Sequence, residues 1–167
     1  NMEIDGKIKL VSHHWSTNPK KGFDMYKKLD EFVGENDKFE FTYIGRKPDD
    51  LILKNSTYIS PIDAEQLSKI LPRNDIYITA SIEEAGANHV LESLAAGLPV
   101  VYHKDGGSIL DYCEDYGEQY SNFEEMVSSI EKVADNYKLY KEKVLCYNDK
   151  IDNVIEKYME VINELQS

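Results

Sequence analysis

The chain has 167 residues, a length that fits one domain large enough to bury a substantial core. Its net charge of −12 argues against a general nucleic-acid-binding protein, which needs a basic face, but permits a small anionic ligand in a locally positive pocket. No apolar run approaches the roughly 20 residues of a membrane span, and Cys113 and Cys146 lack metal-ligand spacing, which favours a reduced, cytoplasmic interior.

Segments with the pattern of strands and helices alternate along the chain. Short apolar segments ended by Gly, Pro or polar residues predict strands at 7–12, 39–44, 57–60, 75–79, 98–102 and 117–120. Helical periodicity and end signals predict helices at 21–33 (closed by Gly34), 63–71 (capped by Asp63), 88–96, 106–114, 122–136, 138–146 and 149–165. This alternation predicts an α/β fold: a single Rossmann-like, doubly wound parallel sheet of about six strands with helices on both faces.

Two carboxylates stand around a Gly-containing turn between a predicted strand and a predicted helix. Glu84 and Glu92 are eight positions apart, on the edge of the sheet where ligands bind in open α/β folds. Carboxylates suit the hydroxyls of sugars and ribose, and the amides of a helix N-terminus suit phosphate. Together these features indicate a nucleotide-sugar site.

At this point the chain resembles the C-terminal, donor-binding domain of GT-B glycosyltransferases, specifically the group 1 enzymes of glycosyltransferase family 4. The resemblance covers nearly the whole chain. It rests on the order and spacing of several motifs: Lys21-Gly22, Glu84 with Glu92, the helix and strand Leu94-Ala-Ala-Gly-Leu-Pro-Val-Val101, Gly106-Gly107, and the late helix with Tyr158.

The resemblance implies a role for each site residue. It makes Lys21 and Glu84 the catalytic pair: Lys21 clamps the diphosphate, and Glu84 contacts the donor sugar or supports the leaving diphosphate. Glu92 accepts hydrogen bonds from the donor ribose. The start of the predicted helix forms the rest of the donor site: Gly86, Ala87, Asn88 and His89. Its small residues permit close approach of a ligand, and its backbone amides meet the α- and β-phosphates. An N-cap role explains Asn88 equally well.

The sequence departs from the family where the first strand ends. Most relatives carry a Gly-Arg there, whereas this chain has Ser12-His-His-Trp15. His13 or His14 could replace the arginine, as could Arg46, or Ser12 together with backbone amides. A metal ion at the two histidines is disfavoured, because adjacent residues of a loop seldom reach one ion. The family needs no metal, so we expect no cofactor.

The sequence gives the fewest signals for recognition of the nucleobase. The tips of the second and third strands, Gly45-Arg46 and Ser60-Pro-Ile62, lie where the base is expected in such a fold, and Leu67 is a candidate to pack on it. Ordinary turn and core roles explain these residues equally well.

The resemblance implies a retaining glycosyltransferase whose donor is a nucleoside-diphosphate sugar and whose acceptor is a glycan, a lipid-linked sugar or a protein. Asn1 precedes Met2, which indicates a cloning remnant, so we expect a domain excised from a two-domain protein, inactive without the N-terminal acceptor-binding domain. We expect a cytoplasmic location, with association of the parent protein with the cytoplasmic membrane face left open.

Two alternative functions are a 2-epimerase of sugar nucleotides with the same fold and a non-catalytic nucleotide-sugar-binding module. A dinucleotide-binding domain is disfavoured, because no Gly-x-Gly-x-x-Gly follows the first strand.

Overall fold

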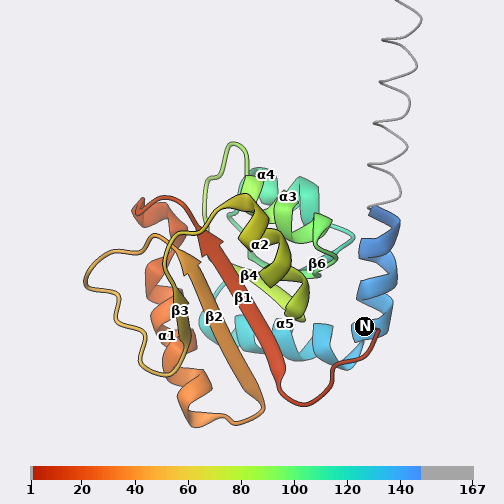
Figure 1. The fold of residues 1–167 in the computed structure, drawn as a ribbon. Helices are drawn as coiled ribbons and strands as arrows, with labels where there is room; N and C mark the ends of the chain where they lie inside the picture. Colours follow the sequence, from red (N-terminus) through yellow and green to blue (C-terminus); the bar gives the residue numbers. More distant parts are fainter. Residues whose placement is uncertain (1, 148–167) are drawn as a thin grey trace, which may run out of the picture.

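The computed structural model describes residues 2–147, so the predicted helix 149–165, with Tyr158, lies outside the described residues. Six strands form a single sheet in the order β3-β2-β1-β4-β5-β6, and every pair is parallel (Figure 1). The strands are β1 (Ile8–His14), β2 (Phe39–Gly45), β3 (Thr57–Ile59), β4 (Ile76–Thr79), β5 (Val100–His103) and β6 (Gly117–Tyr120). The sequence-based prediction of a six-stranded Rossmann-like sheet is confirmed.

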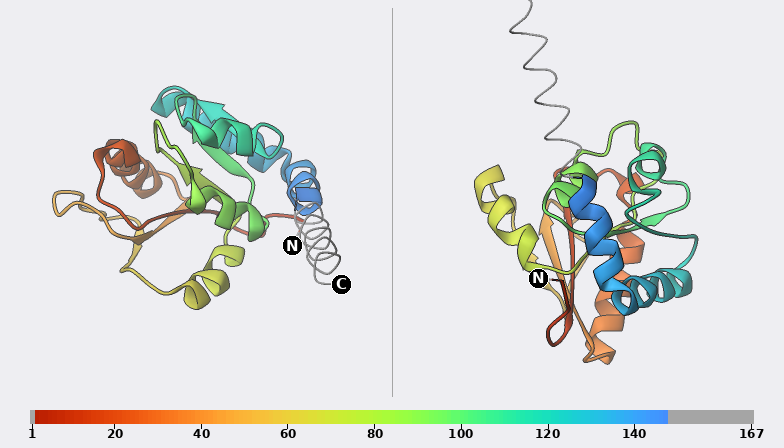
Figure 2. Two further views of the ribbon diagram at one scale, coloured as in Figure 1. Left: turned by 90° about the horizontal axis from the view of Figure 1, so that it is seen from above. Right: turned by 90° about the vertical axis from the view of Figure 1, so that its right-hand side faces the viewer.

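The helices cover both faces of this sheet. They are α1 (Phe23–Glu35), α2 (Ala64–Ile70), α3 (Asn88–Ala95), α4 (Ser108–Cys113) and α5 (Phe123–Asp135), with the 3-10 turns η1 (Pro19–Lys21) and η2 (Leu71–Arg73) and a helical stretch over 137–147. Seen along the sheet, α1 and α2 lie on opposite sides of it (Figure 2). The fold is therefore a three-layer doubly wound domain.

Two apolar clusters, one on each face, hold the layers together. One packs α1 and α5 on the sheet around Leu10, Tyr26 and Phe41. The other packs α2, α3 and α4 around Val11, Leu94 and others. Because both faces are covered, the central strands β1 and β4 are buried almost throughout, as expected for a parallel sheet.

Three predicted boundaries were wrong. β1 runs to His14 rather than ending at Ser12, because His13 and His14 pair with β2 and both buried side chains find hydrogen-bond partners, Glu92 for His13 and Tyr26 for His14. The first helix does not begin at Lys21: residues 19–21 form η1, and Gly22, with a φ of +73°, separates it from α1. Gly34 lies inside α1 rather than closing it. The glycine serves packing instead, because a Cβ there would clash with the Asn55 side chain.

The strand order reverses between β1 and β4, and this reversal positions the site. Chain segments leaving the carboxyl ends of β1 and β4 go to opposite sides of the sheet, which leaves a crevice at that edge. The pairing of β1 with β4 also stops at Val11 and Tyr77, whereas β1 continues beside β2 to His14. The residues after β1 and β4 therefore meet at this switch point.

Candidate functional site

Lys21 and Glu84 lie side by side at the switch point. The Nζ of Lys21 donates to Oε1 of Glu84, and both side chains are only 15% exposed. η1 reaches this place because Gly22 lies against β4's end: a Cβ on Gly22 would stand 2.3 Å from the carbonyl oxygen of Ala80. The Lys-Gly pair of the sequence thus has a physical reason, since the glycine permits the close approach that places the lysine.

The loop after β4 is held in a defined shape that aims Glu84 at Lys21. Glu83 adopts a φ of +53°, in the left-handed region that costs a non-glycine residue energy, and its amide donates to the carbonyl of Asp105 at 2.8 Å. The carbonyl of Glu84 accepts from the Ser108 amide at 2.9 Å, and a Cβ on Gly107 would stand 2.5 Å from that carbonyl oxygen. Gly107 is therefore needed to seat the Glu84 loop on the start of α4.

The entry of α3 presents unused backbone donors. Ala87 is the N-cap and has no side-chain cap hydrogen bond, so the prediction of Asn88 as N-cap was wrong. Across residues 2–147 the amides of Ala87, Asn88 and His89 find no acceptor. A Cβ on Gly86 would meet nothing within 4 Å, so packing does not require a glycine there, whereas the Ala87 side chain belongs to the core. Of these three residues only Asn88 is exposed, while Ala87 and His89 are buried. Unpaired N–H groups at a helix start suit an anion.

Glu92 lies one turn further along α3 and faces β1. Its Oε2 lies 2.7 Å from Nε2 of His13, and the Glu92 side chain is 44% exposed while that of His13 is fully buried. Lys21, Glu84 and Glu92, which the sequence assigned to the donor site, thus come from the segments that follow β1 and β4. Their binding roles stay predictions.

Three histidine rings gather beneath this edge. The centroids of His14 and His89 are 4.9 Å apart, and those of His13 and His89 are 6.3 Å apart. Burial first, and then the nearby charge of Lys21, lower the pKa of His89 to about 3, and burial likewise holds the pKa of His14 well below its usual range. His14 and His89 are therefore neutral at physiological pH, with Nε2 hydrogen-bonded to the Tyr26 hydroxyl and the Thr79 hydroxyl respectively.

Three other predicted site residues, Ser12, Arg46 and Ile62, do not present their side chains to the crevice as Lys21, Glu84 and Glu92 do. The Ser12 hydroxyl is buried and donates to the carbonyl of Ile78, an arrangement that does not favour a ligand contact. Arg46 is exposed beyond β2, and its guanidinium makes no ion pair with the part of the chain that the structure describes. Ile62 and Leu67 pack on the core. The contacts of Ser12, Arg46 and Ile62 with a ligand stay predictions.

Two features of the site were not singled out from the sequence. A groove of about 330 Å³ runs between α2 and α3 beside Glu92, lined on its floor by Leu67, Leu71 and Ala96. Trp15, 39% exposed, stands at the end of β1 with its ring 5.6 Å from that of His13. In the sequence, the signal for Trp15 was a tryptophan shortly after a predicted strand.

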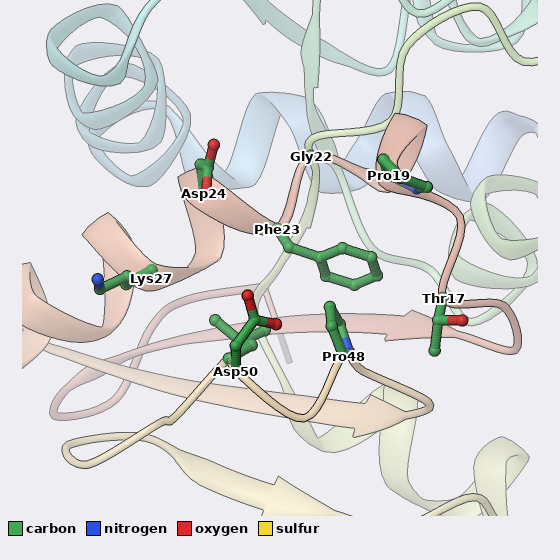
Figure 3. Close-up of a pocket in the computed structure, with 9 residues that line it drawn as sticks. Thr17, Pro19, Gly22, Phe23, Asp24, Lys27, Pro48 and Asp50 are labelled. Carbon is green, nitrogen blue, oxygen red and sulfur yellow. The ribbon is translucent and has the colours of Figure 1, made fainter.

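A separate cavity of about 390 Å³ lies at the start of α1 (Figure 3). The Phe23 ring lies between Pro48 on one side and Pro19 with Thr17 on the other, and Asp24, Lys27 and Asp50 stand around it. None of the predicted site residues lines it. The convergence of Lys21, Glu84, Glu92 and the α3 amides, rather than this hollow, therefore defines the candidate site.

The sheet order and the crevice at its switch point are those of a Rossmann-like α/β domain. The family model of the glycosyl transferases group 1 matches residues 31–144, and the chain belongs to that family. A sequence search of curated proteins found no match.

Solved structures of glycosyltransferases share the fold at low sequence identity. WaaG, a glycosyltransferase involved in lipopolysaccharide biosynthesis, aligns at 17% identity and a TM-score of 0.69 over 87% of this chain and 44% of its own. The pneumococcal O-GlcNAc transferase GtfA, solved with UDP and GlcNAc, aligns at 16% and 0.71 over 95% and 36%. The catalytic domain of cholesterol-α-glucosyltransferase from Helicobacter pylori aligns at 16% and 0.72 over 88% and 98%. The predicted GT-B type of domain is confirmed.

The described residues lack two further features. Between residues 2 and 147, no helix has the length and apolarity that a bilayer crossing requires. Over the same residues, no three His, Cys, Asp or Glu side chains are grouped as a metal site would need. Independence from metal stays a prediction that rests on the resemblance.

Proposed function

We propose that this domain binds the nucleoside-diphosphate sugar donor of a retaining glycosyltransferase. The observation that carries the proposal is the convergence of a lysine, two carboxylates and unused helix amides at the β1–β4 switch point. A nucleoside diphosphate needs these groups in this combination: positive charge and N–H donors for the phosphates, and a fixed acceptor for the ribose hydroxyls.

The diphosphate would lie between Lys21 and the start of α3. A lysine ammonium has three N–H donors, so Lys21 can keep its bond to Glu84 and still donate to a phosphate oxygen. When the bond between sugar and diphosphate breaks, negative charge grows on the leaving oxygen, and the cation with the α3 amides would stabilise it. Glu84 holds Lys21 in place and, beside a diphosphate bound there, would contact the sugar.

Transfer would need a second domain that holds the acceptor. The chain spans 44% of WaaG and 36% of GtfA, so the activity of a whole enzyme is part of this proposal. By the same likeness we propose an acceptor among glycans, lipid-linked sugars and proteins, and a place at the cytoplasmic face of the membrane. The isolated domain should bind donor weakly and transfer little.

Saturation-transfer NMR of this chain with UDP, GDP and ADP tests the proposal. The proposal is supported if saturation is transferred to one nucleotide, and that nucleotide identifies the base. The signal should be lost in Glu92→Ala and kept in Glu31→Gln, which changes the exposed face of α1. A binding signal unchanged in Glu92→Ala would place the nucleotide elsewhere. Absence of any signal, in this chain and in a two-domain parent, would overturn the proposal.

A further inference from the structure

The Glu92 carboxylate is held from below by a buried side chain of the central strand. His13 belongs to β1, Glu92 to α3, and 79 residues separate them in the sequence. Nε2 of His13 lies 2.7 Å from Oε2 of Glu92, while Oε1 accepts no hydrogen bond from residues 2–147. One oxygen of the carboxylate is thus bound inward, and the other is left for a partner at the exposed side.

The His13 ring has little freedom to move. The Tyr77 hydroxyl accepts from the His13 amide at 3.1 Å and donates to the His13 carbonyl at 3.2 Å, so it ties β1 to β4 where their pairing has ended. The rings of Tyr77, Trp15 and His89 surround the imidazole, with centroids 5.4, 5.6 and 6.3 Å away. These contacts hold the imidazole in one position, and α3 places Glu92 within hydrogen-bond distance of it.

The direction of the hydrogen bond follows from what each atom can do. An ionised carboxylate only accepts, so Nε2 must carry a hydrogen. Nδ1 of His13 is buried and has no hydrogen-bond partner among the residues described. Within the described residues the His13 ring therefore hydrogen-bonds to Glu92 alone. Because the side chain is fully buried, it is closed to the direct phosphate contact that the sequence suggested.

We propose that His13 is a positioning residue: it fixes Glu92 so that its free oxygen accepts from the ribose hydroxyls of the bound nucleotide. This rests on the proposed function. A glutamate on an exposed helix face loses rotamer freedom when it binds, and a group already held in one rotamer loses less. Hydrogen bonds behind a binding residue are known to set its orientation in this way.

Two amide variants separate positioning from mere packing. In His13→Gln the amide N–H lies close to the place of Nε2 and can still reach Glu92, whereas in His13→Asn the shorter side chain cannot. The affinities of UDP, GDP or ADP, whichever the chain binds, and of its 2′,3′-dideoxy counterpart are measured for both. We expect H13N to weaken the ribonucleotide about tenfold and to leave the dideoxynucleotide unchanged, while H13Q restores most of the loss.

The outcomes distinguish this proposal from the one it rests on. If the chain binds a nucleotide and H13N keeps the full preference for ribose, or weakens both ligands equally, His13 does not position Glu92 although the proposed function stands. If no nucleotide binds, both proposals fail. Long-range ¹H–¹⁵N spectra give an independent readout: the His13 signals should show hydrogen on Nε2 and shift in Glu92→Ala but not in Glu31→Gln. Unshifted signals would show that the hydrogen bond is absent.

Discussion

Lys21 and Glu84 form an ion pair that joins the turn after β1 to the loop after β4. The neighbouring residues repeat the link on the solvent side, where Lys20 pairs with Glu83. The two lysines therefore offer a matched comparison: the same charge and the same kind of partner, but side chains 15% exposed for Lys21 and 56% exposed for Lys20. Only the inner pair lies in the crevice.

We predict that Lys21→Ala weakens binding of a nucleoside diphosphate by about 1.5–3 kcal/mol, the range for hydrogen bonds to charged groups. The nucleoside without phosphates should bind Lys21→Ala as it binds the wild type. NMR titration with both ligands measures this, and Lys20→Ala is the control that should change neither. If the nucleoside and the diphosphate lose affinity equally, Lys21 supports the fold of the site rather than the phosphates.

Glu92→Gln should preserve the fold and reduce nucleotide affinity, because an amide keeps the shape of the side chain but loses its charge. The expected loss is again about 1.5–3 kcal/mol. Isothermal titration calorimetry gives the affinity, and circular dichroism checks the fold. Glu31→Gln removes a charge from the exposed surface of α1 and serves as the control. An affinity unchanged by Glu92→Gln would remove this carboxylate from the site.

The sequence was sufficient for the order of the elements but not for the end of β1. Periodicity and turn residues mark each strand and helix because burial is local to each segment. Two consecutive histidines look like a loop, and they are tolerated in a buried strand only because Glu92 and Tyr26, distant in sequence, bind them. A polar residue whose partner lies far along the chain cannot be placed from periodicity.

The same limit applies to the site. The spacing of Glu84 and Glu92, with Lys21 after the first strand, was enough to bring all three to one edge, since the carboxyl ends of parallel strands share that edge. That Ser12 would turn inward to Ile78 depends on the register of β1 against β4, which the sequence does not state.

Tyr26→Phe should destabilise the domain. The Tyr26 hydroxyl accepts from the Ala80 amide at 3.0 Å and lies 2.6 Å from Nε2 of His14, all buried, so its removal leaves both groups without that partner. We expect a loss of about 1–3 kcal/mol in the free energy of unfolding, measured in urea. Tyr58→Phe is the control: that hydroxyl donates a hydrogen bond to the Gly45 carbonyl, but the side chain is exposed. Equal effects of the two variants would contradict the role of burial.

The two cysteines should differ in reactivity. Cys113 is buried in the α4 face of the core, where burial raises the pKa of its thiol, and Cys146 is exposed. A thiol reagent should therefore label Cys146 quickly in the folded protein and Cys113 only after unfolding. Mass spectrometry of labelled peptides identifies the site. Rapid labelling of Cys113 in the native state would show that the α4 face opens readily.

Acid should destabilise the domain well before its carboxylates are protonated. The pKa of His89 falls from about 6.5 in the unfolded chain to about 3 in the fold, and that of His14 is lowered in the same direction. Between these limits the unfolded state binds protons that the folded state does not bind, so stability falls as pH falls below about 6.5, by roughly 1.4 kcal/mol per pH unit for each of these two histidines. Urea unfolding at pH 7 to 5 measures the slope. His89→Gln keeps a hydrogen-bonding group for Thr79 and should reduce that slope by one proton, whereas a slope equal to that of the wild type would show that His89 is protonated in the folded domain.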